Sequence, residues 1–167
     1  MTEKHVLSIL VENKPGVLTR ITALFARRSY NIVSLAVGET EQPETSRVTI
    51  AIVGDENEID QIVKQTNKLI NVLHIEELSK VPSVQRRLML IKVNADESRR
   101  TGVLQVVELF RAHVVDVSAE SVVIESIGNE EKLNALVAAL TPYGVKEIVQ
   151  SGSVAISRGP KTIRNEK

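Results

Sequence analysis

The sequence predicts an α+β protein built from two copies of one βαββαβ unit. Apolar residues alternate with polar ones in several short runs, which is the period of a strand. In the longer runs between them, apolar residues recur every three or four positions, which is the period of a helix. The same order of runs begins again after residue 84. Because two helices packed on one face of an antiparallel sheet form a stable layer, we expect two ferredoxin-like domains.

The first unit begins with an alternating run, HVLSILV, which ends at the polar residues 13–16. A helix follows, and its closing pair, Arg27 and Arg28, suits the negative end of the helix dipole. Two strands joined by a polar loop with Pro43 then form a hairpin, before a second helix and a fourth strand. The predicted strands are 4–11, 31–39, 47–54 and 72–78, and the predicted helices are 17–28 and 56–71.

The second unit repeats this order after the stretch SKVPSV. Its second helix opens with Asn129 and acidic residues and is stopped by Pro142 and Gly144. The predicted strands are 86–93, 112–118, 121–128 and 145–151, and the predicted helices are 98–111 and 129–140. The expected organisation is a first domain at 1–78, a linker at 79–84, a second domain at 85–158 and a flexible polar tail at 159–167.

The amino-acid composition excludes several classes of protein and site. The chain has 43% hydrophobic and 25% charged residues, which excludes a disordered protein. Lys and Arg together number 21, as do Asp and Glu, so the basic surface typical of nucleic-acid binding is not expected. The absence of Cys excludes disulfides and thiolate metal sites and fits a reducing compartment. With no apolar signal core at the N-terminus and no membrane-spanning run, we expect a soluble, cytoplasmic protein with no membrane partner.

One edge of the first sheet points to self-association. In this topology the strand order is 4-1-3-2, so the second and fourth strands form the edges. The fourth strand carries His74, Glu76 and Glu77, whereas residues 32–38 of the second strand carry no charge. Such an apolar edge favours pairing with its copy in a second chain, and we predict a homodimer. The alternative is that a loop or the second domain covers the edge. The predicted interface residues are Val33, Leu35 and Val37.

The loop between the first strand and helix has the composition of an anion site. Pro15 is tolerated in a first helical turn, and Gly16 lets another group approach the backbone closely. The N–H groups of Gly16, Val17 and Leu18 then face outward at the positive end of the helix dipole, where a carboxylate fits. The alternative is structural, with Asn13 capping the helix and Pro15-Gly16 forming a tight turn.

Asn31 extends this site toward the edge strand. Its structural alternative is the left-handed position that often follows a helix. If the edge strand meets a second chain, the pocket offers amides for a carboxylate, Asn side chains for an ammonium group and aliphatic walls, which together suit an aliphatic amino acid. The predicted effector-binding residues are Asn13, Gly16, Val17, Leu18, Asn31 and Ile32.

Several segments resemble a known family. They are HVLSILVENKPGVLTRITALFARRSYNIVSL and TSRVTIAIVGDE in the first half, LMLIKV and LFRAHVVDV in the second, and the ending SGSVAISRG. Together they resemble the small, regulatory subunit of acetolactate synthase, also called acetohydroxyacid synthase, with its N-terminal ACT domain. The resemblance covers nearly the whole chain. Its specific part is the combination of Glu12-Asn13-x-x-Gly16, Arg28-x-Tyr30-Asn31-Ile32 and the ending.

The resemblance implies a non-catalytic subunit in branched-chain amino acid biosynthesis. Such a subunit activates a catalytic subunit that uses thiamine diphosphate, with Mg and FAD also expected there, and no cofactor is expected on this chain. It also confers feedback inhibition by valine, or by leucine or isoleucine. In the family the effector lies at the ACT dimer interface near residues that match Asn13, Gly16 and Asn31. Pro15 is not assigned a ligand contact.

Other functions fit the residues less well. An RRM-like RNA-binding module shares the topology, but the first and third strands hold no aromatic residue for base stacking. A metal site is not predicted, because His5, His74 and His113 are isolated from one another. An enzyme is not predicted either, since no nucleophile is paired with a base and no catalytic residue emerges. A stand-alone amino-acid-sensing ACT protein that regulates another enzyme is the remaining alternative.

Overall fold

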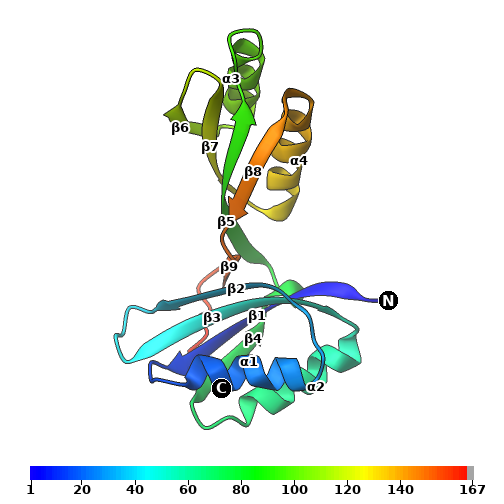
Figure 1. The fold of residues 1–167 in the computed structure, drawn as a ribbon. Coiled ribbons are helices and arrows are strands. Elements are labelled where there is room, and N and C mark those ends of the chain that lie inside the picture. Colours follow the sequence, from blue (N-terminus) through cyan, green and yellow to red (C-terminus); the bar gives the residue numbers. More distant parts are fainter. Residues whose placement is uncertain (165–167) are drawn as a thin grey trace. The chain divides into compact units, whose positions relative to one another are not determined.

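A computed structural model describes residues 1–164 and divides the chain into two compact units (Figure 1). The first unit holds Met1–Val84 together with the end of the chain from Gly152, and the second holds Gln85–Ser151. Within each unit, two helices cover one face of an antiparallel sheet whose four main strands follow the βαββαβ order. The predicted α+β class with two ferredoxin-like units is confirmed.

The first sheet has the strand order β2-β3-β1-β4, as predicted. β1 and β3 pair without interruption, with Leu7 opposite Ile50 and Glu12 opposite Thr45. β2 pairs only with β3 in this sheet, so it forms an edge. The elements are β1 (Glu3–Glu12), α1 (Val17–Arg27), β2 (Ile32–Glu39), β3 (Thr45–Gly54), α2 (Glu56–Asn67) and β4 (Val72–Glu77).

The core of the first unit lies between this sheet and its two helices. Strand alternation sends Leu7, Ile9 and their partners on β3 to the helix side, where α1 contributes Phe25. α2 begins with a capping box, in which the Asp55 side chain accepts from the Glu58 N–H and Glu58 accepts from the Asp55 N–H. The fully buried members include Leu7, Ile9, Ile21, Phe25, Val48, Ile50, Ile52, Ile59 and Ile62.

The second unit repeats the arrangement with the strand order β6-β7-β5-β8. Its core is again aliphatic, with Ile91 and Ile124 from the sheet packed against Val103 of α3 and Leu136 of α4. The elements are β5 (Ser83–Asn94), α3 (Arg100–Leu109), β6 (His113–Val117), β7 (Ser121–Gly128), α4 (Glu130–Leu140) and β8 (Val145–Gln150).

The end of the chain differs from the predicted domain boundaries. Residues 152–158, expected in the second domain, belong to the first unit and include a short strand, β9 (Val154–Ser157). The expected linker at 79–84 is packed as well, because Val81 contacts a buried cluster that includes Leu78 and Ala155. The Val6 N–H also donates to the Ser79 hydroxyl, in the 3₁₀ turn η1 (Leu78–Lys80), at 3.2 Å. Burial of these apolar side chains fixes both segments on the first unit.

The expected flexible tail is also packed in its described part. Ile163 is 6% exposed, and Arg164 forms an ion pair with Glu41. Arg164 further donates to the hydroxyl groups of Thr40 and Thr45. Residues 159–164 are therefore held by burial and by charge-assisted hydrogen bonds, while residues 165–167 lie outside the described part of the chain.

Candidate effector-binding site

Helix α1 starts at a glycine in a left-handed conformation. Gly16 is the N-cap, with φ of 84° and ψ of −9°, and no side chain caps the helix. The predicted alternative, in which Asn13 caps α1, is therefore wrong. A Cβ built at Gly16 would meet no atom within 4 Å, so the space beside this residue is open. The helix start thus has the backbone geometry that favours glycine and an unobstructed approach for a ligand.

The first amides of α1 are available to an acceptor. The first helical bond runs from Arg20 N–H to the Gly16 carbonyl at 3.1 Å. Of the three predicted donors, Val17 makes a long 3.4 Å bond to the Lys14 carbonyl. Among the described residues, the Gly16 and Leu18 amides have no acceptor. These amides lie at the positive end of the helix dipole, which is a favourable position for an anion.

Asn13 fastens the loop to the turn between β2 and β3. Its side-chain N–H₂ donates to Glu39 at 3.2 Å and to the Pro43 carbonyl at 3.0 Å. Its backbone N–H donates to the Glu44 carbonyl at 2.8 Å. Glu39 and Pro43 were not predicted as site residues, because the contacts arise only when the β2–β3 hairpin returns beside the loop.

The neighbouring Glu12 is held by two donors. Lys14 approaches its carboxylate at 2.9 Å, and the Asn71 side chain donates to it at 2.8 Å. The hydrogen bond from Lys14, followed by that from Asn71, lowers the pKa of Glu12. Glu12 therefore stays ionised and helps to fix the loop at neutral pH.

Asn31 is exposed and lies immediately before β2. The left-handed residue after α1 is Ser29, with φ of 59°, so the structural alternative offered for Asn31 is wrong. Tyr30 anchors this turn, since its ring lies 6.4 Å from that of Phe25 and its hydroxyl donates to the Glu58 carbonyl. Burial, and then the charge of Glu58, raises the pKa of Tyr30. Ile32, next in the chain, packs partly against the core.

One chain does not bring all predicted site residues together. Ile32 lies opposite Ile52 on β3, whereas Glu39, which contacts Asn13, lies opposite Ser46. Asn31 and the Asn13 loop therefore occupy opposite ends of β2, about 23 Å apart at about 3.3 Å per residue. Gly16, Val17 and Leu18 lie at the Asn13 end, and Ile32 lies at the Asn31 end.

The β2 edge is partly open and partly covered. Val33 and Val37 are 45% and 47% exposed, while Leu35 packs partly against the core. The end of the same chain approaches the middle of the strand, where a Cβ on Gly152 would lie 2.3 Å from the Leu35 carbonyl oxygen. The Ser153 N–H also donates to the Ser34 hydroxyl. The alternative of a covering segment thus holds at the strand centre, and the flanking valines remain exposed.

Two further structural features bear on the other functions considered. Within residues 1–164, no helix is both long and apolar enough to cross a membrane. Across the same residues, no three or more His, Asp or Glu side chains gather where they would hold a metal ion. His5 instead bonds Glu77, with 2.6 Å between Nδ1 and Oε1.

Comparison with known proteins extends over both units. Residues 86–159 match the family described as small subunit of acetolactate synthase, and residues 7–74 match the AHAS small subunit-like ACT domain. The chain is 55% identical to the acetolactate synthase small subunit of Mycolicibacterium smegmatis over 162 residues, which are 97% of this chain and 95% of that protein. It is 45% identical to the probable acetolactate synthase small subunit of Archaeoglobus fulgidus, over 95% of this chain and 99% of that one.

A solved structure shows the same fold. The crystal structure of the acetolactate synthase small subunit from Thermotoga maritima matches with a TM-score of 0.84 at 41% identity, over 95% of this chain and 99% of that chain. Sequence and fold therefore agree over nearly the full length of each relative. The chain belongs to the acetolactate synthase small subunit family, and its first unit contains the ACT domain.

Proposed function

We propose that this chain is the regulatory subunit of acetolactate synthase, which activates the catalytic subunit and confers feedback inhibition by valine or another branched-chain amino acid. The observation that carries the effector part is the placement of Asn31 and the Asn13 loop at opposite ends of one edge strand, which is covered at its centre and exposed at the flanking valines. A pocket that uses both ends needs two copies of the chain.

A two-fold axis supplies such a pocket. When β2 pairs with its copy about an axis perpendicular to the sheet, the two strands run antiparallel, because the rotation reverses the strand direction. The Asn31 end of each copy then meets the Asn13 end of the other. The dimer has two identical pockets, each with the start of α1 from one chain and the start of β2 from the other.

The chemistry of this composite pocket suits a small aliphatic amino acid. The amides of Gly16 and Leu18 receive the carboxylate, and the side-chain oxygens of the asparagines accept from the ammonium group. Ile32, Val33 and Val37 provide aliphatic contacts. Gly16 has a left-handed backbone and no Cβ, so no side chain of its own stands beside these amides.

We expect Val37→Asp to dissociate the dimer. The substitution places a charge on a half-exposed valine of β2, and the dimer would bury two such charges near one another. Sedimentation equilibrium should show the monomer mass, with the circular dichroism of a folded chain. Val53→Asp is the matched control, because Val53 is 43% exposed but lies on β3. A Val37→Asp protein that sediments as a dimer would contradict the proposed interface.

Calorimetry tests the function itself. Titration with valine should give saturable heat with one site per chain, and the holoenzyme should lose activity over the same concentration range. The thiamine diphosphate, Mg and FAD expected on the catalytic subunit are added to that assay. Parallel titrations use an RNA oligonucleotide and divalent metal ions. Heat with RNA or metal, and none with any branched-chain amino acid, would overturn the proposal.

A further inference from the structure

The face of the first sheet that points away from α1 and α2 carries an unusual pair of polar side chains. Arg47 and Thr49 alternate along β3 with the core residues Val48 and Ile50, so they lie on the opposite face of the sheet. The register places them beside Gly38 and Ala36 of β2. The end of the chain, including β9, packs over this face.

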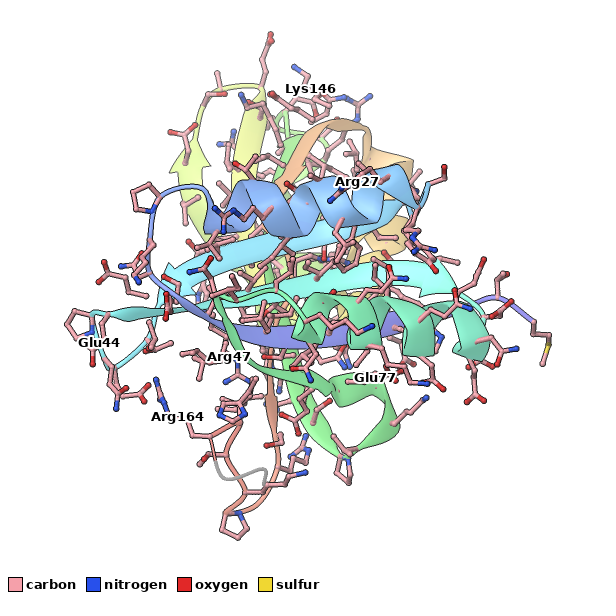
Figure 2. The ribbon with its side chains drawn as sticks, turned by 90° about the horizontal axis from the view of Figure 1, so that it is seen from below. Arg27, Glu44, Arg47, Glu77, Lys146 and Arg164 are labelled. Carbon is pink, nitrogen blue, oxygen red and sulfur yellow. The ribbon has the colours of Figure 1, made fainter. Side chains whose placement is uncertain are left out.

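A groove remains between β9 and the strands β2 and β3. Its volume is about 230 Å³. Arg47, Thr49 and, at one end, Glu39 form its polar part, and Ala36, Val37, Val154 and Ala155 supply most of its apolar lining. Arg47 also borders a second cavity of about 310 Å³, which it shares with Arg164. Figure 2 shows Arg47 and Arg164 close together and Arg27 well apart from them on α1.

The guanidinium of Arg47 uses only part of its hydrogen-bonding capacity. Its Nε donates to the Ser8 hydroxyl at 2.6 Å, and its terminal nitrogens have no acceptor among residues 1–164. Of the nearby carboxylates, Glu41 pairs with Arg164, whereas Glu76 lies 3.9 Å from the Lys161 ammonium and its oxygens accept no hydrogen bond in the described part of the chain. Burial lowers the pKa of Arg47, against the opposing effect of Glu76 and Glu41. A partly desolvated guanidinium without an acceptor favours the binding of an anion.

Thr49 provides a second group for the same ligand. Its hydroxyl makes no hydrogen bond in the described part of the chain, although the residue is only 4% exposed. Because it follows Arg47 by two residues on one strand face, its hydroxyl is positioned to donate to the same anion. The rest of the groove is mainly apolar, which favours an anion that carries a short hydrocarbon chain.

We propose that this groove binds the carboxylate of a short aliphatic acid. Arg47 and Thr49 hold the carboxylate, and Ala36 and Val154 contact the hydrocarbon chain. The site lies within one chain, on the sheet face opposite the helices, and is therefore separate from the composite pocket that uses the start of α1.

Titration with isobutyrate, followed by nuclear magnetic resonance of the ¹⁵N-labelled full chain, tests the proposal. The Arg47 Nε–Hε signal should shift in a saturable way. Arg47→Gln should weaken binding at least tenfold, which corresponds to about 1.4 kcal/mol. Arg27→Gln is the matched control, because it removes the same charge from an exposed position on α1, and it should leave binding unchanged.

Acetate should bind about fivefold more weakly than isobutyrate, since it buries less hydrocarbon.

A second variant is expected to bind isobutyrate more tightly, and it keeps the test valid if Arg47→Gln fails to fold. Glu41→Gln removes a negative charge that acts on Arg47 and releases Arg164, so isobutyrate should bind about threefold more tightly. Weaker binding of isobutyrate to Glu41→Gln than to the wild-type chain would overturn the site. If Arg27→Gln weakened isobutyrate binding as much as Arg47→Gln does, the site would also be overturned. Inorganic phosphate that binds as tightly as isobutyrate would overturn the assignment to an aliphatic acid.

Discussion

Gly16→Asp is expected to abolish valine binding while the chain still folds and activates the catalytic subunit. The substitution places a carboxylate at the start of α1, where the proposed effector carboxylate meets the Gly16 and Leu18 amides. Loss of about 3 kcal/mol of interaction weakens affinity more than a hundredfold. Calorimetry with valine should show no heat at concentrations that saturate the wild-type chain, and the holoenzyme should no longer respond to valine.

The stability of this variant depends on two opposing effects. Because Gly16 has φ of 84°, any side chain there adds backbone strain of about 1 kcal/mol. An acidic group near a helix N-terminus contributes about 0.3–1 kcal/mol in the other direction. Since a Cβ at this position meets nothing within 4 Å, no steric cost is added. The thermal transition should therefore remain cooperative and move by only a few degrees.

Gly16→Asn distinguishes the effect of the added negative charge from the effect of the added side-chain volume on valine binding. Asn has nearly the same size as Asp and tolerates the left-handed conformation, but it is neutral. We expect it to retain most of the stability of Gly16→Asp and to bind valine much better than that variant. If both variants bind valine with wild-type affinity, residues 15 and 16 form only a turn, and the effector pocket at α1 does not exist.

Phe25→Ala is expected to destabilise the first unit by about 3–5 kcal/mol, the range for removal of a buried aromatic side chain. Phe25 is fully buried between α1 and the sheet and packs against Tyr30, so the substitution leaves a cavity beneath the helix that carries Gly16. Amide hydrogen exchange in β1 and β3 should become roughly a few hundred to a few thousand times faster. The affinity for valine should fall as the stability of the first unit falls.

Ile70→Ala is the control for Phe25→Ala. Ile70 is 89% exposed in the same unit, so its truncation should change stability by less than about 0.5 kcal/mol. Exchange in β7 of the second unit should be unchanged in both variants, since β7 contributes to a separate core. Unchanged exchange in β1 and β3 of Phe25→Ala would show that the first core does not depend on Phe25, and equal loss in both variants would show that the effect is not specific to the buried ring.

The sequence by itself determined the order of elements and the edge of the first sheet. Alternation in HVLSILV gave β1, and helical spacing from Val17 gave α1, because each pattern follows from local backbone geometry and one buried face. The uncharged segment at residues 32–38 was correctly placed at an edge, because the βαββαβ order leaves few possible topologies. The amides at Gly16 and Leu18 also followed from local sequence, since every helix start leaves donors unpaired.

The tertiary structure decided the features that depend on contacts between distant residues. The four residues of β9 are too few for alternation to identify a strand, and their position follows from burial of Ala155 beside Val6 and Ala51. Glu76, one of the charged residues noted on the fourth strand, is only 6% exposed, and Lys161 from the end of the chain forms an ion pair with it.

The separation of Asn13 from Asn31 is the most consequential of these features. Both residues flank α1 in the sequence, and only the strand register shows that they lie at opposite ends of β2. Local periodicity specifies which face of an element is buried, because that face is set by residues three or four positions apart or by alternate residues. It does not specify which ends of the elements meet, since that is set by long-range packing and by strand pairing between residues far apart in the chain.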